Sequence, residues 1–510
     1  MIDRRRFLEV IAALGASRAF PVRASDRNIH FDSYPFSLGV ASGYPQPDGM
    51  VLWTRLLGNL HPSAIPVRWE IADDEAMRTI VAAGTAEAQP AWAHSVHVEA
   101  RGLRPDRWYW YRFLAGDAVS PVGRTRTAPA AAAVSSRLRF AFASCQHFEH
   151  GYFNAYRHMV ADDLDLVVFL GDYIYESSLR RNQVRLHERS DEPVTLDEYR
   201  ARYAQYKSDR DLQAAHHAFP WIVTWDDHEV DNDYANDRQE DGTPPEEFLL
   251  RRAAAYQAYY EHMPLPAGMR PSGPAMQIHA TLGWGKLANF YLLDGRQYRS
   301  PHACPRKAGG GNEVDPRECI ELRDASRTML GAGQEAWLDR RFAASRSSWN
   351  IVAQPVLMAQ RKSKSGERQL IWTDSWDGYP AARKRVLESI VARKLANPVV
   401  IGGDVHMHFV ADLKLDFDDD RSPVVASEFV GTSITSAPGS WQRNMPAILA
   451  DNPHLRYGNG DRRGYVRASI AGGRFNADLI GLETVRKPES RAEVLARFVV
   501  EDGKPGPQKA

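Results

Sequence analysis

Four hydrophobic runs of the sequence each end in side chains that could bind a metal ion or move a proton. These side chains are Cys145 after RFAFAS, Asp172 and Tyr175 after VVFLG, the cluster Asp226, Asp227, His228, Asp231, Asn232 and Asp233 after WIVTW, and Asp404, His406 and His408 after VVIGG. In α/β proteins, ligands bind in the crevice outside the carboxyl ends of the strands. If the four runs are neighbouring strands, their ends meet in one crevice, and the sequence predicts a metal centre there.

Each of these residues also has an ordinary structural explanation when it is taken alone. A Gly-Asp pair such as Gly171-Asp172 often forms a turn, and a single cysteine such as Cys145 is often a small buried hydrophobic residue. The adjacent Asp226, Asp227 and His228 are harder to explain in this way, because buried carboxylates that lack a partner are costly. The ordinary explanations would require four independent coincidences at equivalent positions, and this favours the metal centre.

The fourth and second runs differ in how they present their ligands. The strand alternation of the fourth run places Asp404, His406 and His408 on one face and Met407 on the other. Tyr175 lies three residues after Asp172, so a single turn could return its phenol to the crevice, whereas Tyr173 is predicted to pack in the core.

The types of ligand indicate which ions would bind. Carboxylates suit hard divalent ions such as Ca²⁺, Mg²⁺ or Mn²⁺, whereas a thiolate and a phenolate suit a strongly Lewis-acidic ion such as Fe³⁺. Asp172 is the best placed residue to bridge two ions. Two-metal sites generate hydroxide at moderate pH and stabilise the attacking and leaving oxygens of phosphoryl transfer. The sequence therefore predicts phosphoester hydrolysis by metal-bound hydroxide.

The elements that must position these residues form an α/β domain, which we place at 137–500. Its strands are short and continuously apolar, as in a sheet that is covered on both faces, and helical stretches such as 197–218 alternate with them. Residues 31–127 alternate apolar and polar side chains and predict a small fibronectin-like β-sandwich, in which Leu103-Arg104-Pro105 resembles a corner pinned by a tyrosine. Residues 128–136 form a linker and 501–510 a disordered tail.

The beginning of the chain and the cysteines predict export. Arg4 to Arg6, a short apolar stretch and small residues form an export signal of the twin-arginine type at 1–24. Of the three cysteines, Cys304 and Cys319 are the natural disulfide pair in an oxidising compartment.

The 64 basic and 64 acidic residues balance, so no nucleic-acid partner is indicated. No later apolar run is long enough to span a membrane.

The motifs taken together resemble the PhoD-type alkaline phosphatases of the calcineurin-like metallophosphoesterases, which are related to purple acid phosphatases. They are FSLGVASGYPQPDGMVLWTRL, FASCQ, GDYIYE, TWDDHEVDNDY, LDGRQYR, WDGYP and GGDVHMH. The resemblance covers nearly the whole chain. It implies an exported, periplasmic or secreted phosphoesterase with an αββα-sandwich, Fe³⁺ and Ca²⁺, for which Mn²⁺, Mg²⁺ or Zn²⁺ could substitute.

The resemblance also assigns roles to individual residues. The residues expected to hold iron are Cys145, Asp172, Tyr175 and His406. Asp227 or Asn232, together with Asp404, is expected on the calcium side. His228 is expected to donate a proton or to stabilise the leaving oxygen, and Arg296 to hold phosphate oxygens, although a structural ion pair is an equal alternative for Arg296. His408 has no assigned role.

Two other functions stay open on the sequence. One is a phospholipase D-like phosphodiesterase that uses the same chemistry on a diester. The other is an envelope-binding protein without catalysis, in which the metals only stabilise the fold. The extra histidine, His228, favours an enzyme. Whether monoesters or diesters are preferred does not follow from these residues.

Overall fold

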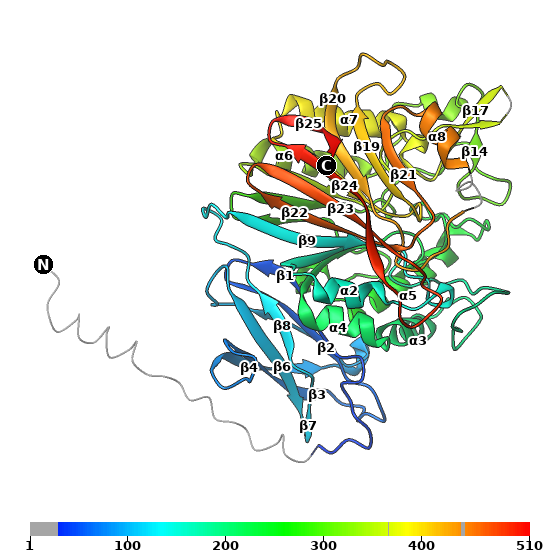
Figure 1. Ribbon diagram of the computed structural model, residues 1–510. Coiled ribbons are helices and arrows are strands. Elements are labelled where there is room, and N and C mark those ends of the chain that lie inside the picture. Colours follow the sequence, from blue (N-terminus) through cyan, green and yellow to red (C-terminus); the bar gives the residue numbers. More distant parts are fainter. Residues whose placement is uncertain (1–28, 366, 440–443) are drawn as a thin grey trace, which may run out of the picture.

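The computed structural model describes residues 29–365, 367–439 and 444–510, so the predicted export signal at 1–24 lies outside the described residues. Two large β-sheets lie face to face and helices pack outside them (Figure 1). Among the described residues, no helix has both the length and the apolar character needed to cross a membrane.

The first large sheet has ten strands within the described part of the chain. In spatial order they are β25 (Lys504–Lys509), β24 (Ala492–Glu501), β23 (Arg474–Leu482), β22 (Gly464–Ala471), β9 (Arg137–Ala143), β10 (Leu166–Leu170), β11 (Pro220–Thr224), β1 (Val40–Gln46), β2 (Gly49–Arg55) and β5 (Ser95–Ala100). The central strands β9, β10 and β11 are parallel to one another. Their carboxyl ends therefore lie at one edge of the sheet, where Cys145, Asp172 and Asp226 follow.

The second large sheet has seven strands within the described residues. In spatial order they are β12 (Ala280–Trp284), β13 (Ala288–Leu292), β15 (Trp349–Ala353), β18 (Pro398–Gly402), β20 (Val424–Val430), β19 (His408–Lys414) and β21 (Leu455–Asn459). Two smaller sheets comprise β4 (Ile80–Ala88), β3 (Ile65–Ala72), β6 (Trp108–Ala115), β7 (Ala118–Val119) and β8 (Gly123–Arg126), and β14 (Glu313–Val314), β17 (Arg368–Trp372) and β16 (Ser363–Ser365).

The main core lies between the two large sheets. The rings of Phe140 in β9 and Phe290 in β13 are 5.3 Å apart, as are those of Phe475 in β23 and Phe429 in β20. In β18 alternate residues serve opposite faces, because Val399 packs into the core between the sheets and Val400 into a second core on the other side. Burial on both faces is the reason that these strands are continuously apolar.

Helices cover the outer faces of the sheets. They are α2 (Ala155–Ala161), α3 (Leu196–Lys207), α4 (Arg210–Ala218), α5 (Pro245–His262), α6 (Gly331–Ala344), α7 (Pro380–Ala392) and α8 (Met445–Asp451). Tyr156 of α2 packs its ring against Trp221 of β11 at 5.8 Å, and Phe342 of α6 lies in the second core with Val400. The single helical stretch predicted at 197–218 is two helices, because the side chain of Asp209 caps a new helix by accepting from the backbone amides of Asp211 and Leu212.

The N-terminal β-strands are joined to the rest of the molecule more closely than a separate sandwich would be. β1 pairs in parallel with β11, so β1, β2 and β5 extend the first large sheet. The predicted tyrosine corner is present: the hydroxyl of Tyr109 accepts a hydrogen bond from the amide of Arg104 at 3.0 Å. The segment 128–136 is free of helix and strand.

The prediction of a disordered tail at 501–510 is wrong. Residues Lys504–Lys509 form the edge strand β25, which pairs antiparallel with β24. The charged and proline-containing sequence there is typical of an edge strand, because a proline can occupy a position whose amide faces away from the neighbouring strand.

Candidate metal centre

The turn after β10 carries the central carboxylate. Gly171 and Asp172 have positive φ values of 101° and 58°. A Cβ on Gly171 would lie 2.6 Å from the backbone nitrogen of Asp226, so glycine is required where this turn meets the loop after β11. The chain then returns, and the hydroxyl of Tyr175 donates to Asp172 Oδ2 at 2.8 Å and lies 3.1 Å from His406 Nε2.

The neighbouring tyrosine lies in a different environment. The hydroxyl of Tyr173 is 2.7 Å from His216 Nε2, and its ring packs against Phe169 at 5.3 Å. The predicted packing role of Tyr173 is confirmed by these contacts. The structure thus separates the two tyrosines of the GDYIYE motif.

Three side chains form the first group of possible metal ligands. Ligand atoms of Cys145, Asp172 and His406 lie within 4.8 Å of one another. Cys145 is buried, is not in a disulfide, and has a φ of 59° at the end of β9. Burial raises the pKa of the Cys145 thiol well above its usual value, and the nearby Asp172 raises it further. A cation is therefore needed to make this thiol a thiolate.

His406 is oriented and held neutral by its surroundings. Its Nδ1 lies 2.7 Å from the carbonyl oxygen of Ala437. Because a carbonyl only accepts hydrogen bonds, Nδ1 carries the proton and Nε2 keeps a free lone pair toward Tyr175. Burial, and then the positive charge of Arg463, lower the pKa of His406 to about 3.

The prediction that Asp404, His406 and His408 share one face of a strand is wrong. β18 ends at Gly402, and Asp404 and His406 have positive φ values of 64° and 55°, so residues 403–407 form a loop. His408 opens β19 and is buried, and its Nδ1 accepts from the amide of Thr432 at 3.2 Å. His408 therefore packs within the second sheet and is not part of the group formed by Cys145, Asp172 and His406.

A second group shares Asp172 with the first. Asp172, Asp227 and His228 place ligand atoms within 4.8 Å of one another. His228 Nδ1 lies 2.7 Å from Glu176 Oε2, and the rings of His228 and Tyr175 are 4.1 Å apart. Burial opposes the charged imidazole, but the carboxylates of Glu176, Asp227 and Asp172 raise the pKa of His228 well above its ordinary value.

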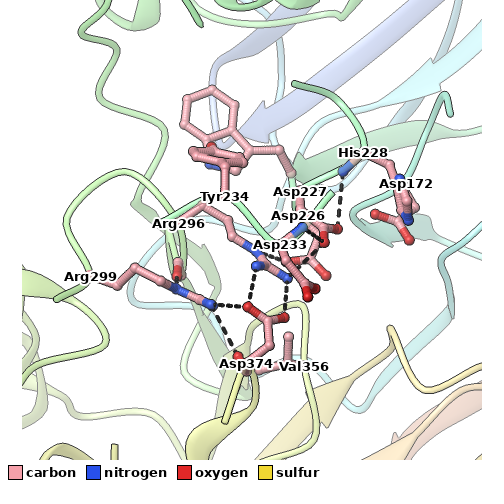
Figure 2. A network of polar contacts seen from close by, with 12 residues as sticks. Asp172, Asp226, Asp227, His228, Asp233, Tyr234, Arg296, Arg299, Val356 and Asp374 are labelled. Atoms are coloured by element: carbon pink, nitrogen blue, oxygen red, sulfur yellow. Dashed lines mark hydrogen bonds and ion pairs between the residues drawn. The ribbon is translucent and has the colours of Figure 1, made fainter. Parts of the chain in front are cut away.

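A third group of carboxylates lies beside the buried Arg296, and one member, Asp374, also accepts from Arg299 (Figure 2). Asp227, Asp233 and Asp374 place oxygens within 4.8 Å of one another. Arg296 donates to both oxygens of Asp374 at 2.7 and 2.9 Å and to Asp226 at 2.5 Å, and it is fully buried. These contacts match the ion-pair alternative for Arg296, whose guanidinium is occupied by carboxylates and not free for a phosphate.

The charge of the site fits bound cations. Burial raises the pKa of Asp172 and of Asp404 well above the ordinary value, and the neighbouring carboxylate of Asp227 adds to both shifts. Burial also raises the pKa of Asp233 to about 8, with Asp374 adding to it. The Oδ1 atom of Asp172 is buried and has no hydrogen-bond partner within the described residues. Carboxylates with raised pKa values and an unused oxygen at their centre are suited to a multivalent cation.

The sequence did not single out some of the residues at this site. Glu176, the last residue of the GDYIYE motif, contacts His228 and also accepts from the backbone amide of Asn232 at 3.2 Å. Asp374 follows the end of β17 by two residues, so the rule that polar residues cluster after strands could have found it. The side-chain nitrogen of Asn232 donates to Glu240 at 2.9 Å, which leaves the amide oxygen as the atom that a cation could use.

The fold and the site define an α/β protein whose candidate metal centre lies at the ends of adjacent strands. The family model described as PhoD-like phosphatase matches residues 140–479, and the model for the N-terminal domain of PhoD-like phosphatases matches residues 22–129. The chain therefore belongs to the PhoD-like phosphatase family and is a phosphoric ester hydrolase.

Two relatives support this assignment along nearly the whole chain. Alkaline phosphatase D of Bacillus subtilis (strain 168) is 45% identical over 527 residues, which cover 99% of this chain and 89% of that protein. A solved structure of PhoD superimposes with a TM-score of 0.90 at 46% identity and covers 94% of this chain and 93% of that chain. The predicted α/β class and phosphoesterase activity are confirmed by these similarities.

Proposed function

We propose that this phosphoesterase is metal-dependent and that its metal centre is built around Asp172. The observation that carries the proposal is that Asp172 lies in two groups of possible ligands at once, one with Cys145 and His406 and the other with Asp227. His228, the third member of the second group, is assigned to proton donation and not to a cation. A carboxylate shared in this way is suited to bridge two cations.

The ligand types support different ions on the two sides. Cys145, Asp172, Tyr175 and His406 offer one thiol, one carboxyl, one phenol and one imidazole, which is a donor set for Fe³⁺. Asp227, Asp404 and Asn232 offer oxygen ligands, which suit Ca²⁺. When bound, the cations supply Lewis-acid stabilisation of the phosphoryl oxygens and an activated water at moderate pH.

His228 supplies the proton that the leaving oxygen needs. Glu176 holds Nδ1 at 2.7 Å, which leaves Nε2 as the atom that can donate. The raised pKa of His228 means that the imidazole carries the proton before the reaction. We assign general-acid catalysis to His228 and give Arg296 the role of holding Asp226 and Asp374 in place.

The two face-to-face sheets with helices outside support an αββα-sandwich of the metallophosphoesterase kind, with the N-terminal β-strands attached to one of its sheets. Export to an oxidising compartment is supported by the disulfide between Cys304 and Cys319, because such bonds persist there. We assign the export to the twin-arginine machinery on the arginines at the start of the chain. Catalysis, as opposed to envelope binding alone, is supported by the similarity to alkaline phosphatase D of Bacillus subtilis, which is named as an enzyme.

The first test is metal content together with colour in the folded, full-length protein. We expect iron and calcium, and a visible absorption band from phenolate or thiolate bound to Fe³⁺. Tyr175→Phe should lose or strongly shift this band and retain less iron, because it removes one ligand. Tyr173→Phe is the matched control, since Tyr173 is equally buried but contacts His216, and its band should be unchanged.

The results can contradict the assignment in separable ways. Active protein without iron or colour would refute the iron ligands and leave the phosphoesterase intact. An unchanged spectrum in Tyr175→Phe would mean that this phenol is not a ligand. Phosphate release from a monoester compared with cleavage of a diester, at equal enzyme concentration, decides between a phosphatase and a phospholipase D-like phosphodiesterase.

A further inference from the structure

A disulfide closes a loop that reaches the third ligand group, Asp227, Asp233 and Asp374, which we call the acidic side of the site. Cys304 and Cys319 are bonded and lie 15 residues apart in the sequence. At the neck of the loop, the side chain of Asn312 donates to the carbonyl oxygen of Cys304 at 3.0 Å, and the amide of Cys304 donates to Glu321 at 2.8 Å. Cys319 also packs in a small core with Val314. The loop is therefore anchored where the bridge lies.

Residues 310–312, which we call the inner limb of this loop, contact the carboxylates of the third ligand group. The amide of Gly311 donates to Asp233 Oδ2 at 2.9 Å. Next to it, Asn312 and Thr373 exchange two hydrogen bonds, one from the Asn312 amide to Thr373 Oγ1 at 2.9 Å and one from the Thr373 amide to the Asn312 carbonyl at 3.0 Å. Thr373 immediately precedes Asp374. The loop thus positions one carboxylate directly and the other through the backbone.

These contacts need the glycines of the loop. A Cβ on Gly311 would lie 2.8 Å from the Cβ of Asp374, and one on Gly310 would lie 3.0 Å from the Cβ of Glu240. Gly310 also has a φ of 72°. The backbone of the inner limb therefore lies directly against the acidic residues, and any movement of the limb is transmitted to them.

We propose that the Cys304–Cys319 loop is an oxidation-dependent clamp that positions Asp233 directly, and the Arg296–Asp374 ion pair beside it, and so strengthens cation binding on the acidic side of the site. This inference rests on the proposed function in that it takes Asp233, which lies in one group with Asp227, to face a bound cation. The hydrogen bonds that orient a metal ligand contribute strongly to affinity, and the loss of one typically costs about 10–100-fold.

Reduction of the bridge releases the clamp. Cys304 is half-buried at the surface end of the loop, so a small reductant can reach it. A water-soluble phosphine takes up the oxygen of a water molecule to become a phosphine oxide, and the S–S bond receives two electrons and two protons to become two thiols. The loop then keeps only its hydrogen bonds and loses its covalent closure.

The test measures calcium affinity in the full-length, iron-loaded protein by titration in a chelator-buffered calcium series. We expect half-saturation at about 10-fold higher free calcium in the double variant Cys304→Ser/Cys319→Ser than in the oxidised wild type. The phosphine should weaken binding in the wild type by the same factor. It should cause no further change in the double variant, which separates the bridge from any effect of the reductant on Cys145.

A glycine pair tests the same contact with the bridge intact. Gly311→Ala should weaken calcium binding in the same direction, because its methyl group displaces the limb from Asp374. Gly333→Ala is the matched control, since a Cβ there meets nothing within 4 Å, and it should bind calcium as the wild type does. If the double variant does not fold, the comparison of these two alanine variants decides.

Several outcomes would overturn the clamp. Equal calcium affinity in the wild type and the double variant would do so while leaving the proposed function intact, and so would wild-type affinity in Gly311→Ala. A further loss of calcium when the double variant meets the phosphine would assign the effect to another group. Oxidised wild type that hydrolyses phosphate esters without binding calcium would instead refute the calcium assignment, and the clamp with it.

Discussion

At the scale of single residues, His228 is the side chain whose surroundings best explain a catalytic role. It is held by Glu176 on one ring nitrogen and packs its ring against that of Tyr175, so its ring is fixed before substrate arrives. Burial opposes its charged form, but the carboxylates of Glu176, Asp227 and Asp172 raise the pKa of His228 well above its ordinary value. An imidazole that is fixed in this way beside a candidate metal centre, and favoured in its protonated form, is suited to protonate a leaving group.

Replacing His228 by Asn should therefore lower kcat by about 10²–10⁴-fold with a smaller change in KM. The loss should be largest for alkyl phosphate esters, whose leaving oxygen needs a proton, and smallest for nitrophenyl esters, whose leaving group is a stable anion. Steady-state kinetics on the two classes of ester measures this difference. Glu176→Gln keeps a hydrogen-bond partner for His228 and should lose less activity. An equal loss on both esters would argue against proton donation.

Lys207 is a buried residue whose cost to stability should depend on pH. Its ammonium group lies 4.3 Å from the Trp53 ring and 5.5 Å from the Tyr173 ring, and burial lowers its pKa to about 7. In the unfolded chain its pKa is about 10.4. Between these two values the unfolded state binds more protons than the folded state, so this group makes stability rise with pH from about 7 to about 10.

Lys207→Met should accordingly stabilise the protein by a few kcal/mol below pH 7, and the gain should shrink as the pH approaches 10. Urea unfolding at pH 6.5 and pH 9.5 measures both values. Lys487→Met, at an exposed lysine, is the control and should show no such trend. If the two aromatic rings offset the cost of burying the charge, the variant would instead lose stability at both pH values.

The candidate ligands could be proposed from the sequence because each follows an apolar strand. Cys145 and Asp172 are examples, and the structure brings them together with His406. What could not be predicted was how each carboxylate is occupied, because the contact between Arg296 and Asp374 joins residues 78 positions apart. A short motif shows which residue type stands at a position. Which side chain pairs with that residue depends on how loops that are distant in the sequence pack together.

At the scale of elements, the candidate metal ligands lie on turns with unusual backbone conformations and not on the strands themselves. Cys145, Asp172, Asp404 and His406 all have positive φ values. Such conformations cost energy for residues with a Cβ and persist at functional sites where the surrounding structure enforces them. Sequence alternation gave no sign that β18 ends at Gly402, because the VIGGDVH pattern fits both a strand and a turn.

Helix α3 shows how an element outside the site supports one of these turns. The hydroxyl of Tyr206 accepts from the amide of Tyr175 at 3.1 Å. Arg202, one turn earlier on the same face, donates to the carbonyl oxygens of Tyr175 and Glu176. The helix thus satisfies the backbone of the turn that carries the phenol. The same helix packs Ala204 near Trp53 of the N-terminal strands.

At the scale of the whole molecule, the N-terminal strands are part of the sheet that carries the candidate site. β1 covers the edge of β11, with Ser42 opposite Pro220 and Gly43 opposite Trp221. Trp53, which is fully buried, donates its indole N–H to the carbonyl oxygen of Glu261 in α5 at 3.0 Å. Sequence patterns marked a boundary near 128, but pairing between strands that are about 180 residues apart is invisible to local patterns.

A chain that begins at residue 128 should therefore fail to form a soluble enzyme. Removing β1 leaves the edge of β11 unpaired, and removing Trp53 with it exposes apolar surface that is buried in the whole chain, which favours aggregation. We expect such a chain to lose phosphoesterase activity and to elute as aggregates in gel filtration, whereas a chain that begins at residue 29 should stay soluble and active. The longer chain should also melt in one transition, since both parts share a sheet. A monomeric, active fragment from residue 128 onward would show instead that the N-terminal strands are an independent accessory unit.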